Sequence, residues 1–273
     1  MNEPMKRDLK KGIWYAAAPG KTVLEKFKAA QAAGFAGIEP PSHLDQDEVL
    51  RARDETGLVV PSVSCGQHSR ALSEPDAAKR AAAVEGIKQA LRDAKRYGAS
   101  SILVVPGGVS EGVTYAQAYQ RVQEELRKAV PLAEELGLKI ACENVWNHFL
   151  LSPMEAARFV DEFNSPAVGW HFDVGNAIYL GWPEQWIRIL GRRIQKLHIK
   201  EFSRQKMGEK GLHAGFAVEY LEGDNDWPAV MKAVDDIGYH GWAIAEPAWQ
   251  PEDVDPAARL SQISAKLDQI LAL

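Results

Sequence analysis

The sequence predicts a single (β/α)8 barrel, on three observations. Short apolar stretches alternate with longer amphipathic stretches along the chain, and glycine ends most of the amphipathic ones. The length of 273 residues is close to the roughly 250 that such a barrel needs. Strands that alternate with helices form parallel sheets, and a closed barrel leaves no strand with an exposed edge. We therefore expect residues 1–273 to form one α/β domain, a TIM barrel.

Eight strands are expected, each an apolar run bounded by glycine, proline or polar residues. They cover residues 12–16, 37–40, 58–65, 101–105, 139–143, 168–173, 194–198 and 242–246. In a barrel of this kind the carboxyl ends of all the strands meet at one face, and functional side chains gather there.

Eight helices are expected after these strands. They cover residues 23–33, 45–56, 75–97, 115–136, a segment that begins after Ser152, 183–190, 227–237 and 256–271. Thr22 is the expected N-cap of the first helix, and Gly34 the residue that ends it. Ser152 and Glu155 have the spacing of a capping box.

Two alternatives concern the architecture. An open, doubly wound sheet would carry a glycine-rich phosphate fingerprint at a strand–helix turn, and the chain has none. Residues 203–226 are longer than an ordinary loop, so they form either a lid with phosphate-binding cations or a solvated surface excursion. The cations of this stretch that would serve such a lid are Arg204, Lys206, Lys210 and His213.

Composition narrows the class of protein. The net charge is −5 and no basic block occurs, which argues against nucleic acid as a partner. The two cysteines, Cys65 and Cys142, lie in apolar runs and are expected to be reduced core thiols. No stretch approaches the roughly 20 apolar residues of a membrane span. The first residues lack the apolar run of a signal peptide, so we expect a cytoplasmic protein, although a chain trimmed of a leader would look the same.

Four chemically distinctive side chains end consecutive predicted strands: Glu143, Asp173, His198 and Glu246. Three carboxylates at one apolar mouth would repel one another unless a cation joined them. Three oxygen donors and one nitrogen favour Mn²⁺ or Mg²⁺, with Co²⁺ possible and Zn²⁺ less favoured. Each residue alone is also compatible with a structural role, because Asp173 can cap a turn and His198 can be a satisfied core histidine. Their shared position at strand ends favours one divalent metal site.

Several local motifs resemble those of one family. They are Glu143-Asn144 and residues 171–176, 197–201, 222–227 and 241–246. With them, essentially the whole chain resembles the xylose-isomerase-like TIM barrels, the AP-endonuclease-2 or sugar phosphate isomerase/epimerase superfamily. Residues 61–68 and 101–105 are similar to the branch of L-ribulose-5-phosphate 3-epimerases, hexulose-6-phosphate isomerase-like proteins and ketose 3-epimerases.

The resemblance implies a set of roles for the strand-end residues. Glu143, Asp173, His198 and Glu246 match the metal ligands of the family, and Glu143 and Glu246 also match its pair of acid/base glutamates. The implied reaction is proton transfer through a metal-bound cis-enediolate, in which one glutamate removes a proton and the other returns one to the opposite face.

Further side chains are expected to contact a substrate, from the resemblance or from their position near strand ends. They are Trp14, His68, Trp146, Asn176, Lys200 and Arg204, and Trp249 has a similar position. The alternatives are an exposed loop histidine for His68, a surface arginine for Arg204 and rim packing for each tryptophan. Asn176 stands where many relatives have a histidine, and Phe149 where ketose 3-epimerases have a glutamate.

The leading hypothesis is a divalent-metal-dependent isomerase or epimerase of a sugar or sugar phosphate. A lyase that dehydrates an inosose or a 3-keto-glycoside is the alternative, since it begins with the same proton removal. An apurinic-site endonuclease is disfavoured by the net charge and by only seven histidines. A non-catalytic sugar-binding barrel would bind metal without turnover. The expected partner is a small-molecule sugar, and the resemblance implies a homo-oligomer.

Overall fold

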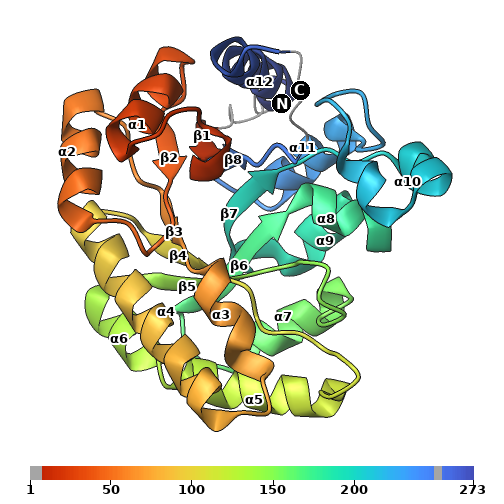
Figure 1. Ribbon diagram of the computed structural model, residues 1–273. Helices are drawn as coiled ribbons and strands as arrows, with labels where there is room; N and C mark the ends of the chain where they lie inside the picture. Colours follow the sequence, from red (N-terminus) through yellow and green to blue (C-terminus); the bar gives the residue numbers. More distant parts are fainter. Residues whose placement is uncertain (1–7, 249–253) are drawn as a thin grey trace, which may run out of the picture.

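A computed structural model describes residues 8–248 and 254–273, in which eight parallel strands form a barrel surrounded by helices (Figure 1). The predicted fold class is therefore confirmed. The strands are β1 Leu9–Trp14, β2 Gly37–Glu39, β3 Ser62–Ser64, β4 Ser101–Val104, β5 Lys139–Glu143, β6 Val168–Asp173, β7 Ile194–Ile199 and β8 Gly241–Ala245.

The sheet runs in the order β2-β1-β8-β7-β6-β5-β4-β3, so the barrel closes between β2 and β3. Hydrogen bonds at this seam come from residues beside the two short strands rather than from a regular ladder. The Ile38 amide donates to the Val59 carbonyl at 3.0 Å, and the Ser64 amide donates to the Pro40 carbonyl at 2.9 Å. The barrel is nearly closed, and its strand ends face one mouth.

Helices follow most strands and cover the outside of the barrel (Figure 1). They are α1 Val23–Ala32, α2 Gln46–Thr56, α3 Gly66–Ser69, α4 Ala77–Tyr97, α5 Tyr115–Arg127, α6 Val130–Leu136, α7 Pro153–Asp161, α8 Val174–Leu180, α9 Pro183–Leu190, α10 Arg204–Lys210, α11 Trp227–Asp236 and α12 Pro256–Leu271. Thr22 caps α1 in a complete capping box, and the Ser152 hydroxyl caps α7. No helix in the described part of the chain has both the length and the apolar character that crossing a bilayer requires.

Several predicted boundaries were wrong. The single helix expected at 115–136 is two helices, α5 and α6, because Pro131 lacks the amide that a continuous helix needs. The strand expected at 58–65 is ordered as a ladder only over Ser62–Ser64. Short helices α3 and α8 were not predicted. The stretch expected to be irregular, 203–226, contains α10 and a 3-10 helix at Leu212–Phe216.

The strands point apolar side chains outward and polar ones inward. In β6, Trp170 and Phe172 are fully buried, and Phe172 stacks on Trp186 of α9 at a centroid distance of 6.2 Å. The alternate residues, His171 and Asp173, therefore face the barrel interior, because successive side chains of a strand point to opposite faces. This alternation delivers polar groups to the inside of the barrel while the helices cover its apolar outside.

Both cysteines are core thiols, as predicted. Cys65 and Cys142 are free and buried, and burial raises the pKa of each thiol to about 12. Neither is expected to form a nucleophilic thiolate at neutral pH.

Near the amino ends of the strands, one large ring lies against two glycines. Trp242 of β8 lies on the same face as Gly12 of β1 and reaches Gly37 of β2. A Cβ at Gly37 would lie 2.6 Å from Trp242 Cζ3 and 2.8 Å from the Val59 carbonyl oxygen. A side chain at position 37 would therefore displace either the ring or the backbone at the barrel seam.

We expect Gly37→Ala to lower the free energy of unfolding by about 1–3 kcal/mol, because the added methyl overpacks the interior. Denaturant titration followed by circular dichroism measures this change. Gly112→Ala is the matched control, since nothing lies within 4 Å of a Cβ there, and it should change stability by less than about 0.5 kcal/mol. Equal stability of both variants would contradict the packing described for Trp242.

Candidate metal centre at the carboxyl ends of the strands

Four side chains converge at the mouth of the barrel: Glu143, Asp173, His198 and Glu246. Glu143 and Asp173 end β5 and β6, His198 lies near the end of β7, and Glu246 follows β8. One ligand atom from each lies within 4.8 Å of the others. His198 Nδ1 is 2.9 Å from Glu143 Oε1, 3.3 Å from Glu246 Oε2 and 4.0 Å from Asp173 Oδ2. The structure thus brings together the four residues that the sequence predicted as ligands.

Lys200 is the second cation of this cluster. Its Nζ lies 2.9 Å from Asp173 Oδ2 and 2.5 Å from Glu246 Oε2. Neither oxygen has a well-directed hydrogen bond, although both are within ion-pair distance of Lys200. Three carboxylates, of which Glu143 and Asp173 are buried and Glu246 is partly exposed, therefore face one imidazole and one ammonium, which leaves the cluster with an excess of oxygen ligands.

The pKa values of these groups reflect burial and mutual attraction. Burial raises the pKa of Glu143, which His198 offsets only in part, and raises that of Asp173 to about 7 against the attraction of Lys200. For Glu246 burial is outweighed by Lys200 and His198, so its pKa is held well below the ordinary value. Burial is likewise outweighed at His198, where Glu39 and Glu246 raise the pKa well above the ordinary value. The imidazole is therefore protonated at neutral pH when no metal is bound.

The donor set fits a divalent cation of hard or borderline character. Asp173 uses Oδ1 to accept the Asn176 amide at 2.7 Å, which caps α8, and leaves Oδ2 directed at the cluster. The capping role and the ligand role are thus compatible in one side chain. His198 would bind through Nδ1, and Glu143 and Glu246 would supply further oxygens.

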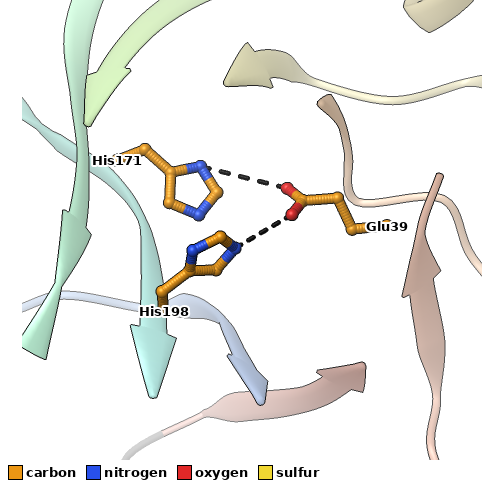
Figure 2. A group of neighbouring side chains, drawn as sticks. All are labelled: Glu39, His171 and His198. Atoms are coloured by element: carbon orange, nitrogen blue, oxygen red, sulfur yellow. Dashed lines mark hydrogen bonds and ion pairs between the residues drawn. The ribbon is translucent and has the colours of Figure 1, made fainter. Parts of the chain in front are cut away.

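Glu39 is a member of the site that the sequence reasoning missed. It ends β2, and its Oε2 lies 2.9 Å from His198 Nε2, on the opposite side of the ring from the cluster (Figure 2). The Ser62 hydroxyl donates to its other oxygen. A carboxylate on the far nitrogen fixes the tautomer and the orientation of a metal-binding imidazole. A signal was present, because residues 37–40 formed a predicted strand with a carboxylate near its end.

His171 completes the group drawn in Figure 2. Its ring centroid is 4.1 Å from that of His198, and its Nδ1 is 4.0 Å from Glu39 Oε1. Burial, followed by the charge of His198, lowers its pKa well below the ordinary value, so the ring is neutral. Glu39, His171 and His198 could also ligate an ion, but only His198 of the three lines the open cavity.

A cavity of about 610 Å³ opens above the cluster. Glu143, His198 and Glu246 form one end of it, and Trp14 and Tyr15 at the end of β1 form part of its wall. The volume lies in the range of small-molecule sites. A sugar-sized molecule in this cavity would touch both glutamates.

The other predicted substrate contacts fall into two groups. Lys200 and Trp14 lie at the cluster and the cavity, as described above. Asn176 lies beside Lys200, but its amide donates to the Asn144 carbonyl at 2.9 Å, so it ties β5 to α8. Trp146 donates to the Asn176 carbonyl and packs on Phe216 at a centroid distance of 4.6 Å.

His68 and Arg204 point away from the cluster. His68 is exposed on α3 and lies close to Gly86 of α4. A Cβ added at Gly86 would be only 2.8 Å from the Cβ of His68. Arg204 donates to the carbonyls of Ile178 and Gly181, both at 3.0 Å, and lies over the Trp182 ring. Neither residue is among the described residues that line the cavity, and their role as substrate contacts stays a prediction. Trp249 lies outside the described residues.

Comparison with known families decides the classification. Residues 27–267 match the sequence profile described as Xylose isomerase-like TIM barrel. The chain belongs to this family. The resemblance inferred from the sequence motifs is therefore confirmed.

Individual proteins with similar sequences match only part of this chain. Inosose dehydratase from Clostridium perfringens is 24% identical over 152 residues, which is 51% of this chain and 50% of that protein. The 2-epi-5-epi-valiolone 7-phosphate 2-epimerase of an Actinoplanes species is 32% identical over 102 residues, 37% of this chain and 36% of that protein. The chain thus spans about half or less of the length of these relatives.

Solved structures share the fold over nearly the whole chain. The 3-keto-D-glucoside 4-epimerase from E. coli has a TM-score of 0.82 at 19% identity and covers 97% of this chain and 100% of its own. An L-ribulose 3-epimerase has a TM-score of 0.82 at 18% identity, covering 97% and 95%. The IOLI protein with a bound zinc atom has a TM-score of 0.79 at 15% identity, covering 97% and 98%. At these identities the likeness is one of fold.

Glu39→Gln is expected to weaken Mn²⁺ binding by about tenfold or more, because the neutral amide is a poorer acceptor for the far nitrogen of His198. Isothermal titration of the chelator-treated protein measures the affinity. Glu85→Gln, an exposed carboxylate of α4, is the control and should bind Mn²⁺ as the unmodified chain does. An unchanged affinity in Glu39→Gln would show that the far carboxylate does not support the ligand.

Mn²⁺ binding at about pH 7 is expected to release at least about one proton per ion, because Nδ1 of a protonated His198 must lose its proton to become a ligand and Asp173, with a pKa of about 7, loses the part it carries. The sign follows from the raised pKa of His198, so the affinity should rise with pH. Titration in buffers of different ionisation enthalpy counts the protons. Proton uptake, or no exchange with the buffer, would contradict the ligand role of His198.

Proposed function

We propose that this protein is a divalent-metal-dependent isomerase or epimerase of a sugar or sugar phosphate. The observation that supports this most is the placement of Glu143 and Glu246. Both lie within 3.3 Å of the same nitrogen of His198, and both line the cavity. Two carboxylates around one bound molecule are what the removal and return of a proton need.

Glu143, Asp173, His198 and Glu246 would hold the metal, for which Mn²⁺ is our first choice and Mg²⁺, Co²⁺ and Zn²⁺ are alternatives. When bound, the ion would polarise a carbonyl and its neighbouring hydroxyl and so acidify the C–H between them. One glutamate would take this proton, and the other would deliver one at the opposite face of the substrate. Lys200, 2.5 Å from Glu246, would hold that carboxylate in place.

The similar proteins support this chemistry by their names. Epimerases of keto-sugars are frequent among the similar structures, including the 3-keto-D-glucoside 4-epimerase and a D-psicose 3-epimerase with a TM-score of 0.79 at 20% identity. The IOLI structure carries a zinc atom, which supports a divalent ion in a barrel of this type. A small-molecule sugar is accordingly the proposed substrate. A cytoplasmic location, a homo-oligomer and the lack of a nucleic-acid partner remain predictions.

A lyase is the second candidate, because inosose dehydratases are among the similar sequences. In that reaction the same proton removal would be followed by loss of water from the next carbon. The active-site glutamates would then act in sequence, one as the base and one as the acid that protonates the leaving hydroxyl. An unsaturated product that absorbs ultraviolet light distinguishes this reaction from epimerisation.

Solvent exchange tests both candidates. The Mn²⁺-loaded protein is incubated in D2O with ketoses, their phosphates, an inosose and 3-keto-glycosides, and each is followed by NMR. Deuterium at one carbon together with a new epimer or aldose supports the isomerase. An unsaturated product supports the lyase. Metal binding without exchange in any compound would favour a non-catalytic barrel and overturn the proposal.

Glu143→Gln and Glu246→Gln are each expected to reduce exchange by about 10²–10⁴-fold at saturating Mn²⁺, because each removes one proton-transfer group. Bound metal is measured in parallel, so that a lost ligand is told apart from a lost acid or base. Glu85→Gln, which alters an exposed carboxylate of α4, is the control and should exchange normally. Full activity in either site variant would contradict the proton-transfer role proposed for that glutamate.

A further inference from the structure

The cavity is lined by charged groups of both signs, which come from different parts of the barrel. Glu143, His198 and Glu246 come from β5, β7 and the segment after β8. The lining also includes Lys26 of α1, His43 of the loop after β2, and Arg70 at the start of a 3-10 helix, Arg70–Ser73. We call these last three residues the basic group. They come from three separate connections on the β1–β3 side of the mouth.

Arg70 is the most available of these cations. Its side chain is exposed, it lines the cavity, and it makes no hydrogen bond or ion pair with any residue that the structure describes. A guanidinium in this state binds phosphate or carboxylate in a bidentate manner, with a charge-assisted hydrogen bond on each of two nitrogens.

Lys26 lies deeper in the wall of the cavity. Its Nζ donates to the Ala18 carbonyl and lies 5.1 Å from the centroid of the Tyr15 ring. Only one of its three donors is used in this way. Burial lowers the pKa of Lys26, which means that its ammonium has lost part of its hydration and would gain from a bound anion.

The carboxylates that line the cavity belong to other strands. In the described part of the chain they are Glu143 at the end of β5 and Glu246 after β8. Glu48, which acts on Tyr15 through its charge, lines a separate depression with Thr22 and Arg51. A group of cations on the wall of a cavity attracts anions from solution.

We propose that the substrate carries a terminal anionic group, a phosphate monoester or a carboxylate, that binds at Arg70 and Lys26 with His43 beside them. This inference rests on the proposed function, since the keto end of the same molecule would lie at Glu143 and Glu246. The body of the sugar would then span the cavity along Trp14 and Tyr15. The anion-binding group lies on the β1–β3 side of the barrel, not on residues 203–226, where the sequence had suggested phosphate-binding cations.

Anion binding is tested without turnover. The probes are glycerol 3-phosphate, glycerate and glycerol, titrated into the full-length, chelator-treated chain, so that no metal binds the anion. We expect glycerol 3-phosphate or glycerate to bind, and glycerol not to bind. Arg70→Gln should lose about tenfold in affinity for the anion, the amount that a charge-assisted pair contributes. Arg92→Gln removes one exposed charge of α4 outside the cavity and should bind as the unmodified chain does.

The outcomes separate this inference from the proposed function. Tighter binding of the phosphate identifies a sugar phosphate, and tighter binding of the carboxylate identifies a sugar acid; both support the proposal. Equal affinity in Arg70→Gln and Arg92→Gln overturns it, as does binding of glycerol as tight as that of the anions. Lys26→Met provides a second variant, with the same expectation as Arg70→Gln. Deuterium exchange in neutral ketoses without anion binding would support the proposed function. The same result would refute the inference that the substrate is an anion.

Discussion

The neutralisation of buried carboxylates by Lys200 and His198 is the constraint on which the mouth of the barrel depends. Asp173 is fully buried and Glu143 is 6% exposed, so each carboxylate would be costly without a counter-charge. His198 lies on β7 and Lys200 directly follows this strand, so the two side chains, two residues apart, face the interior together. This strand and the residue after it therefore supply the positive charge for carboxylates from β5, β6 and the segment after β8.

Further polar and charged side chains lie inside the barrel next to this cluster. Glu39 holds the far side of His198, and the Lys196 ammonium donates to the Ser100 hydroxyl at 2.8 Å. Burial lowers the pKa of Lys196 to about 8, which shows that the barrel interior destabilises the charged form of this side chain. The apolar packing that offsets such costs lies outside the strands, where residues such as Phe159 and Phe172 are fully buried beneath helices.

The aromatic and cationic residues at the mouth of the barrel form two groups. One group packs against neighbouring segments, and the other lines the cavity. On the β6–β7 side, Trp146, Phe202 and Phe216 pack on one another, with centroid distances of 4.6–5.5 Å, and Arg204 binds carbonyl groups. The residues on that side therefore hold neighbouring segments together. On the β1–β3 side, Arg70 and Lys26 line the cavity. The chemical asymmetry of the cavity follows from this division.

The sequence by itself determined the barrel and the convergence of Glu143, Asp173, His198 and Glu246 at its mouth, because both follow from local properties. The alternation of apolar and amphipathic runs sets the order of strands and helices, and a carboxylate or histidine at the end of a parallel strand must face the common mouth. Glu39 carried the same signal, since residues 37–40 were a predicted strand with this carboxylate near its end, but ligands were predicted only at the ends of strands five to eight.

Only the tertiary structure decided which side chains of the loops face the cavity. His68 lies beside Gly86, and Arg204 donates to carbonyls of α8 and the residue after it, although their positions in the sequence suggested the mouth. Lys26 and Arg70 carried no sequence signal, yet they share one cavity wall. The direction of a loop side chain depends on contacts between segments far apart in the chain, and these contacts leave no periodic pattern in the sequence.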